Sequence, residues 1–414
     1  MSQWDPIWRV KIDGVAYTTA ILANLSINAG RRTIYEQSQA GYISIDLIET
    51  TQSTIPVQIN STISVEIQDT SATWVTIFGG NVTDVDLAVR STGSIMFTQT
   101  YTIIALGALA RLQKALTEGV LAKDHDGDQI AVILEDLLLQ TWAEVAGATS
   151  WATYDATATW ATAGNIGLGE IDQPGDYELA ARSSAVTDIY SLVAALATSG
   201  LGYIYEDSQG RISYADSTHR SQYLSTNGYV NISANQARGV GLKQSTRAGD
   251  VRNYVTIKYG ASGSSQVTDS DTDSILEYGT LSQIITTTIF NGADATAQAA
   301  FYLAIRKTPQ PIFSEITFDL TNPALDNGDR DSLIGAFMGM PVSIADLPAN
   351  MGSIFQGFVE GWSFQAGFKR LAITLKVSPV AYSLQSLAWQ DIAGAFTWSG
   401  VSPTLDWARA TIIT

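Results

Sequence analysis

The sequence predicts a mixed β protein with α-helices, in which two related antiparallel β domains flank a helix-containing α+β middle region. Three observations predict this fold class: alternating apolar and polar residues near both ends, helical spacing in the middle, and a short repeat that links the two end regions. A chain of 414 residues, 45% of them hydrophobic and 15% charged, has enough apolar side chains for two or three globular domains.

Residues 1–110 are predicted to form the first β domain. Apolar and polar residues alternate in STISVEIQ (61–68) and again in SIMFTQTYTII (94–104). Such alternation is typical of strands that place one face on the core and the other in water. We therefore expect a half-buried antiparallel sheet in this region.

The middle region, residues 111–240, is predicted to combine helices with one hairpin. AVTDIYSLVAALATSG (185–200) predicts a helix that ends at Gly200, and LGYIYEDSQGRISYAD (201–216) predicts two short strands around a turn. Residues 141–182 are rich in Ala, Thr, Gly and Trp with weak periodicity, which favours a loop-rich insertion.

One stretch of the middle region raises the question of calcium. Asp124, Asp126, Asp128 and Glu135 stand at places 1, 3, 5 and 12 of an EF-hand loop, but Gln129 occupies the sixth place, where the turn requires glycine. The residues after Gln129 have helical spacing, so we favour Asp126 as a helix cap that forms a capping box with Gln129. No cofactor and no metal site are predicted, and adventitious Ca²⁺ at the three aspartates stays open.

Residues 241–380 are predicted to form the second β domain. RNYVTIKYG (252–260), SEITFDL (314–320) and RLAITLKV (370–377) all alternate apolar and polar residues. Between the first two lies DATAQAAFYLAIRKTPQP (294–311), an alanine-rich stretch that predicts a short helix ending before Pro309.

A repeat connects the two β regions. VEIQDTSATWVTIFGGNV (65–82) aligns without a gap on VSIADLPANMGSIFQGFV (342–359), at a constant offset of 277 residues. The identical positions of the first copy are Val65, Ile67, Asp69, Ala72, Ile77, Phe78, Gly80 and Val82. We interpret the alignment as a duplicated β unit, while chance similarity between two short hairpins is the alternative.

Composition argues against several classes of function. The 40 acidic and 23 basic residues give a net charge of −17, which disfavours binding to a phosphate backbone. The absence of cysteine excludes disulfides and thiolate metal sites, and only two histidines are present. We find no catalytic motif, secretory signal or membrane-spanning stretch, so we expect a non-enzymatic protein made in the cytosol.

With these features in place, the chain resembles siphophage minor tail proteins of the baseplate-hub (tail tip hub) class. The resemblance is carried by WRVKIDG (8–14), IFGGNVTDVD (77–86), the hairpin at 200–216, and the late series RNYVTIKYG, MPVSIADLP (340–348) and FQGFVEGW (355–362). Together these stretches cover about residues 5–380, in the order found in that family.

The resemblance implies a homotrimer in which each chain supplies two tube-like β-barrel domains, so that six similar units form a pseudo-sixfold ring. Such a ring would dock on a hexameric tail tube or distal tail protein and continue or close the DNA channel. Its location would be the tail tip of the virion, after synthesis in the host cytoplasm. The implied partners are other tail-tip or fibre proteins, and phage DNA that passes without specific binding.

Two sets of residues are candidates for interaction. Asp84 and Asp86 lie next to the glycine turn of the first repeat and are candidates for the wall of the channel, where carboxylates would repel DNA; a solvated outer surface is the alternative. Residues 381–414 form a predicted C-terminal arm, in which tryptophans recur every nine residues and could dock on a partner or fold back on their own chain. These tryptophans are Trp389, Trp398 and Trp407.

Two other functions stay open at this stage. The chain could be a tail-tip protein that binds carbohydrate on the host surface, or a polysaccharide hydrolase that uses paired carboxylates. Against a hydrolase, the predicted β units and middle region account for nearly the whole chain and leave no separate catalytic domain.

Overall fold

The protein is described from a computed structural model. The residues that the structure describes are 4–17, 20–51, 53–92, 95–141, 168–236, 242–352, 354–367, 370–384, 386–387 and 412–413. The tryptophan-bearing segments at 142–160 and 389–407 lie outside them.

One large sheet dominates the architecture, and 13 of the described strands belong to it. Its continuous path runs β16-β20-β23-β22-β3-β4-β7-β6-β5-β1-β2, and β21 joins β22 to β15 beside this path. The strands from the first part of the chain are β1 (Trp8–Ile12), β2 (Val15–Tyr17), β3 (Ile21–Gly30), β4 (Tyr42–Glu49), β5 (Thr62–Gln68), β6 (Trp74–Thr92) and β7 (Ile95–Leu106). Those from the last part are β15 (Val230–Ser233), β16 (Lys243–Ser245), β20 (Ile312–Asp319), β21 (Pro341–Ala345), β22 (Ile354–Gly367) and β23 (Arg370–Pro379).

The same five-strand arrangement occurs twice in this sheet. The spatial order β3-β4-β7-β6-β5 in the first part corresponds to β16-β20-β23-β22-β21 in the last part, and all pairings in both series are antiparallel. In both series the chain forms the strands in the same order: the first and second positions, then the fifth, the fourth and the third. The predicted duplication therefore extends well beyond the aligned hairpin.

A β-bulge marks the same place in both copies. Between β6 and β7 the register shifts around Thr83, and between β22 and β23 it shifts around Glu360, which is 277 residues further along the chain. The first strand of the hairpin differs, because Val65 lies opposite Phe78 whereas Ile344, not Val342, lies opposite Phe355. The gapless alignment is thus correct for β6 and β22 but two residues out for β5 and β21. An even shift keeps each side chain on its own face.

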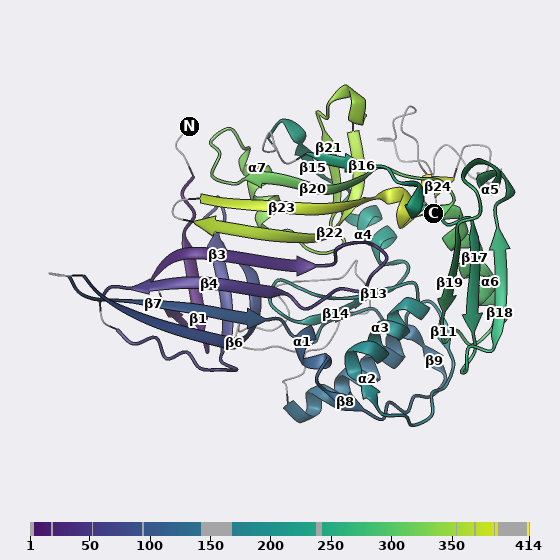
Figure 1. Ribbon diagram of the computed structural model, residues 1–414, viewed down its shortest axis with the longest axis horizontal. Helices are drawn as coiled ribbons and strands as arrows, with labels where there is room; N and C mark the ends of the chain where they lie inside the picture. Colours follow the sequence, from purple (N-terminus) through teal and green to yellow (C-terminus); the bar gives the residue numbers. More distant parts are fainter. Residues whose placement is uncertain are drawn as a thin grey trace.

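The two copies meet at the pairing of β22 with β3, which runs from Gly361 opposite Gly30 to Ala366 opposite Leu25. One face of this joint is apolar and buried, with Trp362 and Phe364 packed beside Ile27. Figure 1 shows β23, β22, β3, β4 and β7 side by side as successive strands of a single sheet. The joint makes the two β regions one continuous hydrogen-bonded surface.

The middle of the chain packs against one end of this sheet. Its helices are α1 (Leu109–Leu112), α2 (Asp126–Thr141), α3 (Ile189–Ser199) and α4 (His219–Asn227), followed by the 3₁₀ turn η2 (Ala234–Gln236). Its short strands are β8 (Leu116–Thr117), β9 (Asp124–His125), β10 (Leu168–Ile171), β11 (Glu178–Leu179), β12 (Thr187–Asp188), β13 (Tyr203–Glu206) and β14 (Ile212–Ala215). The predicted helix at 185–200, with Gly200 at its C-cap, and the predicted hairpin β13–β14 are both confirmed.

A separate three-stranded sheet follows β16. It contains β17 (Tyr254–Tyr259), β18 (Ser265–Ser270) and β19 (Ser282–Thr286), with α5 (Thr272–Tyr278) between the last two, and α6 (Gly292–Arg306) packs on β17 and β18. The predicted helix at 294–311 is therefore confirmed as α6. RNYVTIKYG is a strand as predicted, but it lies outside the large sheet. The elements still to be named are η3 (Ala248–Asp250), α7 (Asn327–Ile334), η4 (Ala349–Met351), η5 (Val380–Tyr382), β24 (Ser386–Leu387) and β25 (Ile412–Ile413).

The prediction of a half-buried sheet is wrong for β5. Ile63, Val65 and Ile67 are buried as expected, but the alternate residues Ser64 and Glu66 are buried as well. Glu66 is tolerated there because it forms ion pairs with Arg9 and Lys11 of β1. The strand is therefore covered on both faces.

Candidate interaction sites

A buried ion cluster lies where the sheet, the joint and the middle region meet. Glu360, the extra residue of the β22 bulge, accepts from Arg31 Nε at 2.7 Å and from Arg220 Nη1 and Nη2, each at 2.9 Å. The Ser378 hydroxyl also donates to the Glu360 carboxylate. Both guanidinium groups stack on the ring of Tyr203. We refer to Arg31, Arg220 and Glu360 as the Glu360 cluster.

The Glu360 cluster is charged in the folded protein. Burial alone would raise the pKa of Glu360, but attraction to Arg220 and Arg31 outweighs it and holds this pKa far below its usual range. The three side chains are 2–6% exposed, so little water screens them. Arg31 directly follows β3, Arg220 lies in α4 and Glu360 lies in β22, so the cluster connects the first β region, the middle and the last β region. The cluster stabilises the β3–β22 joint, whose backbone hydrogen bond from Arg31 N to Glu360 O measures 2.8 Å.

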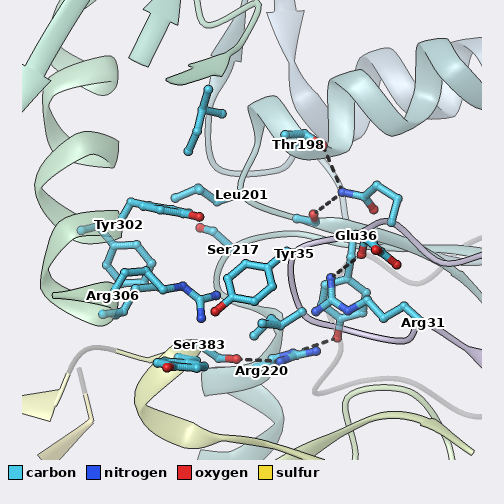
Figure 2. A pocket seen from close by; sticks show the side chains of 18 of the residues that line it. Arg31, Tyr35, Glu36, Thr198, Leu201, Ser217, Arg220, Tyr302, Arg306 and Ser383 are labelled. Atoms are coloured by element: carbon cyan, nitrogen blue, oxygen red, sulfur yellow. Dashed lines mark hydrogen bonds between the residues drawn. The ribbon is translucent and has the colours of Figure 1, made fainter. Parts of the chain in front are cut away.

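A cavity of about 170 Å³ lies beside the Glu360 cluster, and Arg31 and Arg220 form part of its lining (Figure 2). Arg306 of α6 is 3% exposed, and its guanidinium stacks on Tyr35, Tyr382 and Tyr302 at 4.6, 4.3 and 5.7 Å from the ring centroids. Among the described residues its Nε and Nη1 atoms have no hydrogen-bond partner. The three ring faces compensate the buried charge, since cation–π contacts strengthen when desolvated. We interpret this cavity as a gap in the packing where the segment after β3, helix α6 and the turn η5 meet.

Glu206 connects the middle region to the first β region. Its carboxylate, at the end of β13, accepts from the backbone N–H of Gly41 at 2.6 Å and from that of Leu109. Burial raises the pKa of Glu206 to about 7, although these two hydrogen bonds act in the opposite direction. A second contact lies nearby, because Gly79 of β6 and Gly210 of the β13–β14 turn touch backbone to backbone.

The predicted EF-hand positions do not form a loop. Asp126 is already the first residue of α2, and Glu135 lies further along the same helix. Asp126 is buried and its carboxylate accepts from Tyr177 N at 2.8 Å and from the Tyr214 hydroxyl, while burial raises its pKa to about 6. The predicted capping box is also wrong, because the Asp126 N–H donates to Tyr177 O and the Gln129 amide donates to Ala122 O.

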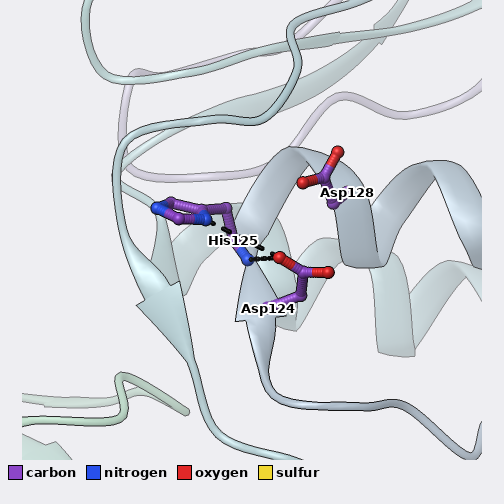
Figure 3. A group of neighbouring side chains, drawn as sticks. All are labelled: Asp124, His125 and Asp128. Atoms are coloured by element: carbon purple, nitrogen blue, oxygen red, sulfur yellow. Dashed lines mark hydrogen bonds and ion pairs between the residues drawn. The ribbon is translucent and has the colours of Figure 1, made fainter.

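A different trio clusters at the surface of this helix end. Atoms of Asp124, His125 and Asp128 that could ligate a metal lie within 4.8 Å of one another (Figure 3). Asp124 and His125 are 53% and 43% exposed, with 3.6 Å between His125 Nδ1 and Asp124 Oδ1. Exposed acidic groups of this kind are common at helix N-termini, where the positive end of the helix dipole stabilises their negative charge.

The structure also brings together a histidine and an aspartate that the sequence did not connect. His219 Nδ1 lies 2.5 Å from Asp172 Oδ2, and burial lowers the pKa of His219 in spite of Asp172. The ring is 1% exposed and packs edge-on against Tyr203 and Tyr205. A substrate cannot reach a ring covered in this way, so the pair is a packing contact and not an open catalytic dyad.

Asp84 and Asp86 are exposed on the same face of β6, beyond the bulge. In the described part of the chain, β5 pairs with β6 only as far as Asn81, so the edge that carries Asp84 and Asp86 has no partner strand. Leu87 and Val89 on this edge are 54% and 56% exposed. Whether the two aspartates face a channel stays a prediction. Trp389, Trp398 and Trp407 lie outside the described residues.

Comparisons with known proteins identify the fold. No family profile matches the chain, and no curated protein matches its sequence. The tail protein from Neisseria meningitidis MC58 is similar in structure, with a TM-score of 0.58 and 9% identity over 92% of this chain and 98% of that protein. The 43 kDa tail protein of prophage MuSo2 from Shewanella oneidensis has a TM-score of 0.51 and 13% identity over 91% and 99%. The chain therefore has the fold of these two tail proteins.

Within the described residues, no helix combines the length and the apolar character that a bilayer crossing requires.

Proposed function

We propose that the protein is a structural hub of a phage tail tip, in which three copies form a pseudo-sixfold ring that docks on the hexameric tail tube. The ring continues or closes the channel through which DNA leaves. The similarity in fold to two tail proteins, across almost the whole length of each, supports a structural role in a tail.

The single observation that carries the proposal is the five-strand arrangement that occurs twice in one chain. Three copies with one unit each present three equivalent edges, whereas three copies with two units present six. In this proposal residues 1–110 and 241–380 are the tube-like β-barrel domains, 111–240 form the middle region, and 381–414 are an arm that contacts the next tail component. The Glu360 cluster then fixes the angle between the two units of each chain.

The charge of the chain fits passage of DNA without binding. A net charge of −17 repels phosphates, and a channel with few basic residues would not retain the DNA. The proposal assigns the protein no reaction, and its partners are other tail proteins.

The test is the mass and shape of the purified protein. Size-exclusion chromatography with light scattering should give about three times 44.4 kDa, and negative-stain images should show a ring with threefold or pseudo-sixfold symmetry. Addition of the tail tube protein of the same phage should produce rings seated on tube ends. A protein that stays at 44.4 kDa at micromolar concentration, with and without tube protein, would refute the proposal.

A further inference from the structure

The free edge of β6 corresponds to an edge that is occupied in the second copy. In β22, the residues beyond the bulge at Glu360 pair with β3 of the first copy. In β6, the residues beyond the bulge at Thr83 pair with β7 on one edge, and no described strand pairs with their other edge. The duplication thus produces two equivalent edges, of which the described strands of one chain fill only one.

The strand that would fill the second edge is also identified by the repeat. β3 occupies the first place of the five-strand arrangement, and β16 occupies the same place in the second copy. β16 ends the path of the large sheet, and within the described residues it pairs only with β20. The backbone stays extended past the strand, since Arg247 has φ −131° and ψ 130°.

We infer that the edge of β6 from Asp84 to Val89 pairs with β16 of a second copy of this chain, and that this contact repeats the β22–β3 joint between subunits. Within one chain the two strands lie at opposite places in the sheet, with β20, β23, β22, β3, β4 and β7 between them. A contact between a first-copy edge and a second-copy strand of the next chain is head-to-tail, and it closes a ring of three when each chain is rotated by a third of a turn from the last. The inference rests on the proposed function in taking three chains to form that ring.

The register of the contact follows from the internal joint. Gly361 lies opposite Gly30 and Gln365 lies opposite Ser26 in the β22–β3 pairing. Residues that lie opposite one another across the strands of each copy show which positions are equivalent. By this comparison Asp84 is equivalent to Gly361, and Lys243 is equivalent to Ser26. Transferred to the contact between chains, the register sets Asp84 opposite Arg247, Asp86 opposite Ser245, and Ala88 opposite Lys243.

Charge on the two edges supports this register. Residues directly opposite on antiparallel strands lie on the same face, so both aspartates of β6 would meet the face that carries Lys243 and Arg247. All four side chains are exposed in the single chain. An exposed strand edge with apolar side chains is prone to unwanted pairing unless it is covered, and the contact would cover Leu87 and Val89. Asp84 and Asp86 then act in assembly, which is an alternative to a place on the channel wall.

The chain contains no cysteine, so introduced pairs report on this contact alone. We expect the A88C/K243C and L87C/Q244C variants to form disulfide-linked dimers and trimers under mild oxidation, because adjacent cross-strand pairs alternate in spacing and at least one suits a disulfide. A88C/T246C is the matched control, since its cysteines would lie about 10 Å apart along the strand and on opposite faces. Single A88C and K243C proteins should remain uncrosslinked.

Charge variants give a second measurement. D84R and R247D should each weaken assembly, by roughly two- to fivefold in the midpoint concentration, and the double variant should recover most of the loss. Light scattering of the wild-type protein separates the two proposals. A trimer in which A88C/K243C and L87C/Q244C link no better than the control would overturn this pairing but leave the proposed function intact. A wild-type protein that stays monomeric would overturn the proposed trimer, and with it this contact.

Discussion

Removal of the Glu360 carboxylate should strongly destabilise the protein. In the E360Q variant two buried guanidinium groups, those of Arg31 and Arg220, lose their only acidic partner in the cluster. Loss of one member of a buried ion pair typically lowers the free energy of unfolding by about 3–5 kcal/mol, because a buried charge remains without compensation. Glutamine has nearly the same volume, so the change is electrostatic. Urea unfolding followed by tryptophan fluorescence would measure the difference in free energy of unfolding between the two proteins. Urea is uncharged, so the measurement adds no salt that would screen the charges.

A matched control is available at the surface. Glu178 pairs with Lys123 at 2.5 Å, but both side chains are substantially exposed. We expect E178Q to lower the free energy of unfolding by no more than about 0.5 kcal/mol, since exposed pairs are well solvated. An E360Q protein within about 1 kcal/mol of the wild type would refute the importance assigned to the cluster.

The pH dependence gives an independent check. The pKa of Glu360 is lower in the folded protein than its ordinary value of 4.5, so the stabilisation by its charge is fully present above pH 4.5. As the pH falls below 4.5 the unfolded chain takes up the proton first, and the difference between wild type and E360Q should shrink. A difference that grows on acidification would contradict the argument.

Three further predictions concern other contacts. Glu206 has a pKa of about 7 in the folded protein against an ordinary 4.5, so the folded state holds its proton more tightly than the unfolded chain does. As the pH rises from 4.5 to 7, the free energy of unfolding of the wild type relative to E206Q should therefore fall, by up to about 3 kcal/mol. Urea unfolding at several pH values would measure this fall, and a constant difference would disprove the prediction. A Cβ on Gly79 would lie 2.2 Å from the Gln209 carbonyl oxygen, so G79A should lower the free energy of unfolding by about 1–3 kcal/mol in thermal or urea unfolding. The control variant G249A should change it little, because a Cβ there meets no other atom within 4 Å. Equal stability of the two variants would count against the contact. Calcium at about 1 mM should raise the melting temperature by less than about 1 °C, because Asp126, Asp128 and Glu135 lie in helix α2 and Asp124 in the strand before it, so these positions do not form an EF-hand loop. A larger rise that D124N/D128N abolishes would show a site at the exposed trio.

The sequence could predict the elements that depend on local pattern. The helices α3 and α6 and the hairpin β13–β14 follow from spacing and turn residues within a few positions. The repeat could be found because eight identities lie at one offset, and the bulges at Thr83 and Glu360 keep that offset.

Distant contacts decide what the sequence could not predict. Alternation in β17 indicates a strand but not the sheet to which it belongs. Asp126 has the sequence pattern of a helix cap, but its carboxylate accepts hydrogen bonds from the Tyr177 N–H and the Tyr214 hydroxyl, which are distant in sequence. The partners of Glu360 lie 329 and 140 residues away along the chain. The one local signal was a lone glutamate between apolar residues in FVEGW, which implies a buried charge in need of a cation.

The joint between β3 and β22 also affects how the chain is made. Residues 25–30 leave the ribosome more than 330 positions before residues 361–366, their partners in the sheet. At usual rates of translation of about 5–20 residues per second, the β3 edge waits roughly 15–65 s for its neighbour. During that interval it presents unpaired N–H and C=O groups beside apolar side chains, a state open to pairing with nascent neighbours. Folding of the first half is therefore incomplete until residues 361–366 have been made, and a chaperone or rapid synthesis would raise the yield of correctly paired protein.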